Sequence, residues 1–185
     1  MKIPMEDPFA QQAVEFLTKI GLNIEIVQGA TGFLPTIEIR DGSLRVDPGA
    51  CASNILHEAG HLAIVPGRFR GYLSGNLNQG MVRIQDELIE ENLEPDSYEM
   101  RAMMQAGDTE ATAWAWAAGK AIGLPEHEII RSEEYGGEGE GIRFMLSLCA
   151  YVGIHGISHA GFCLPRENPY CGRPAYPQMA FWLQP

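Results

Sequence analysis

Apolar residues recur at helical spacing near the start of the chain, from residue 8 to residue 20. Gly21 follows the last of them, which is typical of the end of a helix. This pattern predicts an opening amphipathic helix. The apolar residues that define it are Phe9, Ala13, Phe16, Leu17 and Ile20.

Apolar and polar residues then alternate in three short segments, residues 23–28, 36–40 and 43–47. Asp41-Gly42 joins the second segment to the third, and such a pair between alternating segments is a strong hairpin signal. We therefore predict a small, mainly antiparallel sheet. The turn that leads out of this sheet is Asp47-Pro48-Gly49.

The next segment, residues 54–65, is a largely apolar helix that contains His57-Glu58-Ala59-Gly60-His61. On a helix, His57 and His61 lie one turn apart on the same face, and Glu58 lies about 100° around the axis. A buried helix is a costly place for two imidazoles and a carboxylate without a partner. With a third ligand the imidazoles could hold zinc and leave a corner for water, whose proton Glu58 could take.

The glycine inside this helix, Gly60, is informative about packing. Gly60 costs about 1 kcal/mol relative to alanine in a helix interior. Its presence indicates that another backbone segment passes close to the helix.

The alternative interpretation of the His57-to-His61 motif is a core helix whose histidines hold no metal.

The remainder of the chain is predicted as further helices and loops. The helix that opens at Gly107-Asp108 is rich in alanine, with Asp108 as its N-cap, and stops near Gly123. The other predicted segments are a glycine-rich loop (68–80), a helix with a solvated acidic face (82–93), a short helix (96–106), a short helix with a mobile loop (126–141), an apolar helix (142–152) and an irregular tail rich in aromatic residues and proline from 154 onward. We expect this tail to pack across the body, where it could cover the cleft.

Glu110 is the best candidate for the third ligand, because it opens a helix of small residues that can pack against the histidine helix. A carboxylate in a first turn is also commonplace, since it favours the helix dipole. His127, the next histidine along the chain, is the reserve ligand.

Composition limits the domain count and the partners. A chain of 185 residues with 45% hydrophobic and 20% charged residues predicts a single domain over residues 1–185. The net charge of −11 argues against binding to nucleic acid or to an anionic membrane surface. No apolar run approaches the length of a membrane span, and acids and prolines occupy the start, so we expect a cytoplasmic protein.

The four cysteines are too few and too widely spread for a disulfide scaffold, so reduced thiols are expected. One cluster offers alternatives. His155, His159, Cys163 and Cys171 could bind a second zinc, or Cys163 and Cys171 could form a disulfide.

The order of these features, a strand hairpin, the His57-to-His61 helix and a later helix with Glu110 and Ala113, resembles the zincin metallopeptidases over residues 35–120. Within them it is most similar to the gluzincin branch and its compact bacterial ImmA/IrrE-like forms. The resemblance implies an α+β, zincin-like fold, with a small sheet on the active-site helix and a substrate groove below the edge strand. It also implies zinc on His57, His61 and Glu110, with Glu58 as general base and later proton donor.

Two departures from that family pattern concern the ligands. Trp114 stands where several gluzincins carry an aspartate that orients a zinc histidine, so the acceptor must come from elsewhere, such as Asp108 or a backbone carbonyl. No third histidine follows His61 at the metzincin spacing, which disfavours that branch.

A hydrolase of this kind needs a donor that faces the oxyanion of the attacked carbonyl. The available residues are His155, His159, Tyr135 and Tyr151, and His159 is our first choice as this catalytic residue because glycines flank its loop. The predicted function is a zinc-dependent hydrolase, most simply a peptidase with a peptide or protein substrate. The alternative is a catalytically weak or inactive zincin-like domain that acts as a metal-stabilised regulatory or binding protein.

Overall fold

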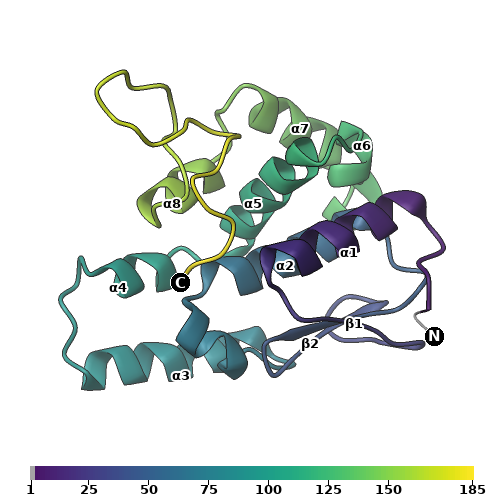
Figure 1. Ribbon diagram of the computed structural model, residues 1–185, viewed down its shortest axis with the longest axis horizontal. Coiled ribbons are helices and arrows are strands. Elements are labelled where there is room, and N and C mark those ends of the chain that lie inside the picture. The colour runs from purple at the N-terminus through teal and green to yellow at the C-terminus, as the bar shows by residue number, and fades with distance from the viewer. Residues whose placement is uncertain (1–2) are drawn as a thin grey trace.

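The computed structural model describes residues 3–185 and has an α+β architecture, with a small sheet at one edge of a larger group of helices (Figure 1). The elements are α1 (Pro8–Ile20), β1 (Ile24–Ile26), β2 (Ile37–Arg40), β3 (Ser43–Val46), α2 (Ala52–Ile64), the 3₁₀ helix η1 (Gly67–Tyr72), α3 (Leu77–Glu90), α4 (Tyr98–Met103), α5 (Asp108–Ala121), α6 (Glu126–Ile129), the 3₁₀ helix η2 (Ser132–Tyr135), α7 (Gly139–Ser147) and α8 (Gly153–His159).

The opening helix α1 confirms the prediction from apolar spacing. The side chain of Asp7 accepts a hydrogen bond from the backbone N–H of Phe9 and caps the helix start. Gly21 ends the helix in the left-handed conformation, with φ of 102°. The apolar face of α1 packs against α2.

The predicted hairpin across Asp41-Gly42 is present, because β2 and β3 pair antiparallel from Arg40 opposite Ser43 to Ile37 opposite Val46. The sheet as a whole is mixed rather than mainly antiparallel. Its strand order is β1-β3-β2, and β1 pairs parallel with β3. Residues 27–36 carry the chain from one edge of the sheet to the other, so that β3 returns between the two edge strands.

The helix with the two histidines, α2, packs chiefly against α5. The expectation that a backbone passes close to Gly60 is confirmed. A Cβ added at Gly60 would lie 2.7 Å from the carbonyl oxygen and 2.9 Å from the Cα of Ala111 on α5. The absence of a side chain at Gly60 therefore allows the two helix backbones to approach at this point.

Two glycine-rich segments that we predicted as loops are helical. The 68–80 segment contains η1 and the start of α3, where the Asn76 side chain accepts from the N–H of Asn78 as an N-cap. The segment after residue 152 contains α8. There, Gly153 lies against the Thr109 carbonyl and Gly156 against the Glu110 side chain, so these glycines permit helix packing rather than flexibility.

The second half differs from prediction mainly in its helix bounds. The apolar helix α7 begins at Gly139 and ends at Ser147, earlier than the predicted 142–152. The 126–141 segment holds α6, η2 and the first turn of α7. α6 packs against α5, and Ile129 and Ile130 are buried in the core.

The C-terminal segment packs across the body, as expected. The indole Nε1 of Trp114 donates to the Trp182 carbonyl at 3.1 Å. The side chain of Gln184 is buried and donates to the Ala160 carbonyl at 2.7 Å, while its backbone N–H donates to the Ala63 carbonyl at 2.9 Å. These bonds tie the chain end to α2, α5 and the end of α8.

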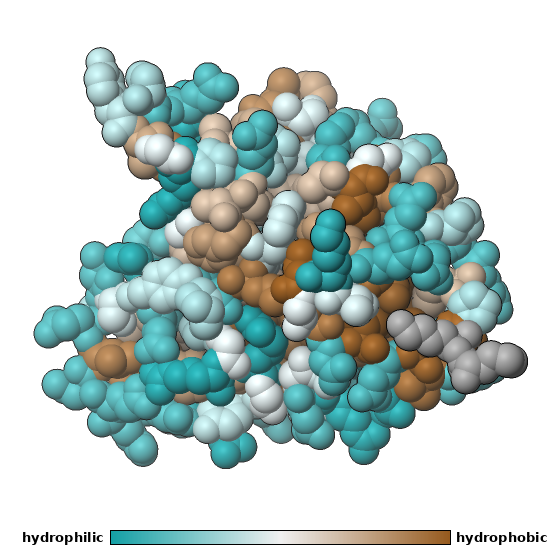
Figure 2. All heavy atoms as spheres, in the orientation of Figure 1, coloured by the Kyte–Doolittle hydropathy of each residue, from teal (hydrophilic) through white to brown (hydrophobic). Residues whose placement is uncertain are grey.

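On the face shown in Figure 2, hydrophilic residues cover the periphery and hydrophobic residues gather in a band over α1 and the C-terminal segment. The rings of Phe16 on α1 and Trp182 in the C-terminal segment pack edge to face, with centroids 5.1 Å apart. Over residues 3–185, none of the helices has both the length and the apolar character that crossing a membrane requires.

The contact at Gly60 predicts the sign of a stability change. Gly60→Ala should lower the free energy of unfolding by about 1–3 kcal/mol, because a methyl group must push Ala111 and α5 away. Gly141→Ala on α7 is the matched control. Open space surrounds Gly141, so helix propensity should make that change neutral or stabilising by up to about 1 kcal/mol. Urea unfolding of both variants measures the difference, and a stabilised Gly60→Ala protein would contradict the packing argument.

Candidate metal centre

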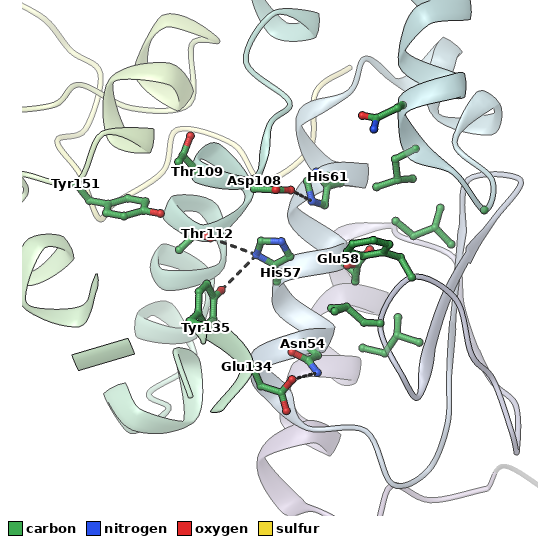
Figure 3. Close-up of a pocket in the computed structure, with 17 residues that line it drawn as sticks. Asn54, His57, Glu58, His61, Asp108, Thr109, Thr112, Glu134, Tyr135 and Tyr151 are labelled. Carbon is green, nitrogen blue, oxygen red and sulfur yellow. Dashed lines mark hydrogen bonds and ion pairs between the residues drawn. The ribbon is translucent and has the colours of Figure 1, made fainter. Parts of the chain in front are cut away.

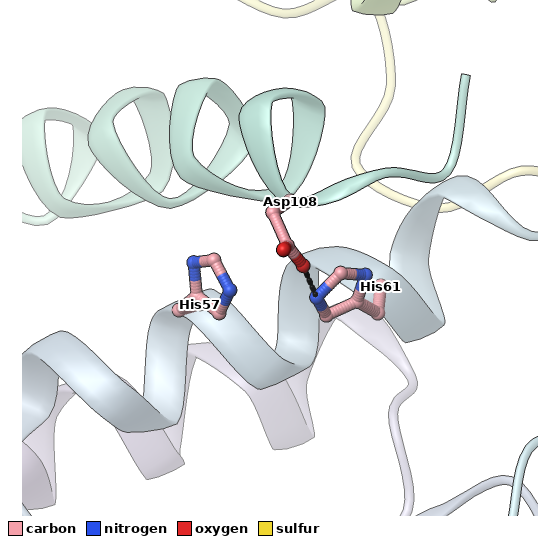
Figure 4. A group of neighbouring side chains, drawn as sticks. All are labelled: His57, His61 and Asp108. Atoms are coloured by element: carbon pink, nitrogen blue, oxygen red, sulfur yellow. Dashed lines mark ion pairs between the residues drawn. The ribbon is translucent and has the colours of Figure 1, made fainter. Parts of the chain in front are cut away.

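The burial of α2 brings polar groups into the interior. Of its thirteen residues, all except His57 are buried. His57 and His61 lie one turn apart on the side of α2 that faces α5, with ring centroids 5.1 Å apart and planes at 83°. Figure 4 shows both rings beside the start of α5.

Asp108 supplies a carboxylate to this pair. It is the first residue of α5, which Gly107 caps, so its side chain is free to extend toward α2. Its Oδ1 lies 3.3 Å from Nε2 of His61. One ligand atom each from His57, His61 and Asp108 lie within 4.8 Å of one another, and within residues 3–185 no other set of His, Cys, Asp or Glu side chains meets this criterion.

These three residues fit the requirements of a zinc ion. Two imidazole nitrogens and a carboxylate oxygen are a donor set that zinc takes in catalytic sites. Ligand atoms of a tetrahedral site with bonds near 2 Å lie about 3.3 Å apart. The observed separations therefore require only a small closure of the side chains.

Each imidazole is oriented by a second contact. Nδ1 of His61 lies 3.1 Å from the Ala106 carbonyl, to which it can donate. Nδ1 of His57 lies 3.3 Å from the hydroxyl oxygens of both Thr112 and Tyr135. Trp114 has no carboxylate that could orient a histidine. The backbone carbonyl of Ala106 takes that place for His61. The hydroxyls of Thr112 and Tyr135 take it for His57 (Figure 3). Such contacts fix the tautomer of a ligand histidine.

The two histidines differ in their affinity for protons. Burial, followed by the charge of His61, lowers the pKa of His57 to about 4. For His61, burial also acts downward, but the hydrogen bond with Asp108 and the charge of Glu58 outweigh it and raise the pKa. The same hydrogen bond lowers the pKa of Asp108. Without an ion, a proton on His61 therefore pairs with Asp108.

Glu58 is buried, with 8% of its surface exposed, and it lines the same cavity as the two histidines. Burial raises the pKa of its carboxyl group. A carboxylate with a raised pKa accepts a proton more readily than an exposed one. The general-base role of Glu58 stays a prediction, and the structure places the residue in the cavity that such a role requires.

A cavity of about 420 Å³ opens above these groups. One wall is apolar and comes from the 33–34 loop, β2 and the start of α3; the other wall is polar. The apolar lining residues are Phe33, Leu34, Ile37, Ile39 and Leu77, and the polar ones include Asn54, Thr109, Thr112, Glu134, Tyr135 and Tyr151. No residue after Tyr151 lines the cavity, so the described C-terminal tail does not cover the cleft.

Glu110, the predicted third ligand, does not join the histidines. Its carboxylate accepts a hydrogen bond from the Thr109 hydroxyl at 2.9 Å, and its side chain packs against Gly156 of α8. Residues two apart point to different sides of a helix. With Asp108 toward α2, Glu110 lies toward α8.

His159, predicted as the oxyanion donor, is exposed at the end of α8 and does not line the cavity. His155 is also exposed and lies in a separate depression. Tyr135 and Tyr151 are the members of that predicted group that reach the cavity. The reserve ligand His127 is exposed on α6, away from the cavity.

The second cluster predicted from the sequence is not assembled within the described residues. All four cysteines are free, so Cys163 and Cys171 form no disulfide. Cys163 is buried beside the Ser158 hydroxyl, at 3.3 Å, whereas Cys171 is exposed in the tail. His155, His159, Cys163 and Cys171 form no metal-binding group within residues 3–185.

The sequence alone does not identify Asp108 as a third ligand, or Thr112 and Tyr135 as contacts of His57. The sequence predicts Asp108 as the N-cap of this helix or as an acceptor for a histidine, whereas in the structure Gly107 is the N-cap and Asp108 is the first helical residue. Thr112 lies one turn further along the same face of α5. Tyr135 contacts His57 on α2 from a distant part of the sequence, and no local sequence pattern predicts that contact.

The lowered pKa of His57 predicts a pH-dependent stability of the metal-free protein. The unfolded state takes up a proton near pH 6.5 and the folded state only near pH 4. The stabilisation is therefore present above pH 6.5 and is lost as the pH falls toward 4, by up to about 3 kcal/mol. His57→Gln should remove this part of the pH dependence in urea unfolding with a chelator present, whereas His127→Gln on exposed α6 should retain it. Equal slopes for His57→Gln and the parent protein would refute the assignment.

Comparisons with protein-family models, with curated proteins and with solved structures found no match to this chain.

Proposed function

We propose that this protein is a zinc-dependent hydrolase of the zincin type that cleaves peptide bonds. The observation that carries the proposal is a buried carboxylate, Glu58, that lines the same cavity as three potential metal ligands, His57, His61 and Asp108. Separate metal-binding and proton-transfer groups at one opening are the requirement for metal-assisted hydrolysis.

His57, His61 and Asp108 would hold the ion. When bound there, zinc supplies Lewis-acid chemistry, which lowers the pKa of a water molecule and polarises a carbonyl group. The neutral state of His57, favoured by its lowered pKa, leaves its nitrogen lone pair available to a metal. His61 must give up its proton first, which the raised pKa makes costly at low pH.

Glu58 acts as the proton carrier. Its carboxylate takes a proton from the attacking water and returns it to the amine of the departing peptide segment. The pKa raised by burial suits both steps, because it brings the carboxyl group nearer to neutrality. This role needs no second acidic residue.

Tyr135 and Tyr151 replace His159 as donors to the carbonyl oxygen. Burial raises the pKa of both phenols, so they stay protonated at neutral pH. If His57 binds the ion through Nε2, its Nδ1–H donates to the Thr112 or Tyr135 oxygen. The hydroxyl proton of Tyr135 is then free to point into the cavity.

The sheet favours an extended substrate. β2 is an edge strand of the sheet and contributes Ile37 and Ile39 to the cavity wall. Edge strands can pair with an extended peptide through main-chain hydrogen bonds. A peptide laid along this wall would cross the floor on which Glu58 and the histidines lie.

Metal binding distinguishes the two candidate carboxylates. Asp108→Asn should weaken zinc binding by at least about tenfold, because it removes a charged ligand. Glu110→Gln is the matched control and should change affinity little, since its side chain packs against Gly156. Competition with a zinc-sensitive dye measures both constants. The opposite ranking would return the third ligand to Glu110.

Turnover tests the role of Glu58. Glu58→Gln should keep one equivalent of zinc by elemental analysis while cleavage of a quenched peptide library falls by about a hundredfold or more. Glu90→Gln, on the exposed face of α3, should behave like the parent protein. Undiminished cleavage by Glu58→Gln would reject the general base. The parent protein could instead hold zinc and cleave no peptide, both as purified and after its zinc has been removed by a chelator and added back. That result would support the alternative of a metal-stabilised binding protein.

A further inference from the structure

Glu134 is a carboxylate at the cavity that the proposed hydrolysis does not use. It belongs to η2, lines the cavity on the polar wall, and lies next to Tyr135. Its Oε2 accepts a hydrogen bond from Nδ2 of Asn54 at 2.8 Å. Figure 3 shows the pair on the same side of the cavity as His57.

Asn54 anchors this carboxylate to the metal helix. Asn54 is buried, with 6% of its surface exposed, and precedes His57 by three residues on α2. Residues at this spacing share a helix face, about one turn apart. A buried amide aimed at an exposed carboxylate therefore holds Glu134 at a fixed distance along the helix from the ligands.

Tyr135 fixes the same segment a second time. Its hydroxyl lies 3.3 Å from Nδ1 of His57, and the two rings meet edge to face with centroids 5.9 Å apart. η2 is thus attached to α2 at two successive residues. Glu134 is positioned relative to the catalytic floor rather than left on a free surface loop.

The charge of Glu134 is not neutralised by neighbouring cations. Within residues 3–185, no basic nitrogen lies within ion-pair distance of its carboxylate. Arg131 is paired with Glu128 and Asp7, and Arg143 donates to the Ile130 carbonyl. Both arginines line a neighbouring depression that Glu134 also borders, but neither arginine lines the cavity.

The cavity as a whole lacks a lysine or an arginine. Its lining residues include the carboxylates of Glu58, Asp108 and Glu134 but no lysine or arginine. With a divalent ion in place, Glu58 and Asp108 together offset its charge. Glu134 is then the uncompensated charge of the site, and the net charge of −11 on the chain adds to the attraction for cations.

We propose that Glu134, held by Asn54, is the specificity-determining residue of a subsite for a positively charged nitrogen of the substrate. This inference rests on the proposed function, because it describes how a peptide would lie in the same cavity. Two sources share that chemistry, a lysine or arginine side chain and the free amino terminus of the peptide. The ammonium or guanidinium group would donate to the Glu134 carboxylate while apolar residues contact the wall formed by β2 and the 33–34 loop.

Binding to a hydrolytically disabled protein tests the proposal without turnover. The protein is zinc-loaded Glu58→Gln, and the probes are fluorescein-labelled uncharged peptides with one lysine moved along the sequence, each with a norleucine twin. Every peptide is made with a free and with an acetylated amino terminus, to separate the two sources of charge. Fluorescence anisotropy should give roughly fivefold tighter binding for the lysine peptide, as expected of a partly exposed ion pair, and a preference that shrinks with added salt.

The matched variants are Glu134→Gln and Glu133→Gln, each combined with Glu58→Gln. Glu133 is exposed on the same 3₁₀ helix and does not line the cavity, so its variant should keep the lysine preference. Glu134→Gln should abolish the preference and Glu134→Lys should reverse it. A preference that survives Glu134→Gln, one lost equally in Glu133→Gln, or no preference at all would overturn the inference.

The two proposals fail in different ways. Suppose that the parent protein cleaves peptides in a zinc-dependent manner, and that Glu134→Gln does not change the lysine preference in binding or in KM. The subsite proposal is then wrong and the hydrolase proposal stands. If lysine peptides bind through Glu134 but no peptide is cleaved, the subsite proposal stands and the hydrolase proposal is wrong. A preference that disappears on acetylation, with or without lysine, assigns the charge to the peptide amino terminus.

Discussion

The close approach of α2 and α5 is the constraint on which the site depends. Gly60 leaves no side chain between the helices, so the backbone of Ala111 comes into direct contact with α2. On its other side, α5 contacts Gly153 of α8 through the backbone carbonyl of Thr109 and Gly156 through the side chain of Glu110. Backbone contacts on both sides leave α5 little freedom to rotate or slide, because interiors are close-packed and resist deformation. The first residue of α5 is therefore aimed at the histidines.

This packing explains why polar groups can lie so deep. A buried imidazole or amide needs a partner, since each unsatisfied polar group costs free energy. His61 has the Ala106 carbonyl, His57 has two hydroxyls, and Asn54 has Glu134. The partners come from the segment before α5, from α5 itself and from η2. The elements packed on α2 thus orient its side chains, and this orientation leaves the ring nitrogens that face the cavity available for a ligand.

The cavity combines two walls of different chemistry around one floor. The edge strand and the 33–34 loop supply apolar contact, whereas η2 and α5 supply hydroxyls and carboxylates. Negative charge without lysine or arginine disfavours phosphate and other anionic substrates. It also makes the polar wall complementary to cationic groups. Under the proposed function, a peptide would contact both walls, because it can present apolar and basic side chains on opposite sides of an extended backbone.

Local patterns in the sequence were sufficient for the opening helix, the hairpin, the histidine helix and the close contact at Gly60. Each depends on spacing along one element, and the relation of His57, Glu58 and His61 is a property of the helix itself. The choice between Asp108 and Glu110 was not local, because both open α5 and only its rotation against α2 and α8 decides which carboxylate faces the histidines. The same holds for the helical state of the glycine-rich 153–159 segment, where glycine serves packing rather than flexibility. Tyr135 and Glu134 reach the cavity through contacts between residues about 80 positions apart in the sequence, and only the tertiary structure can set such contacts, because they depend on how the intervening helices pack.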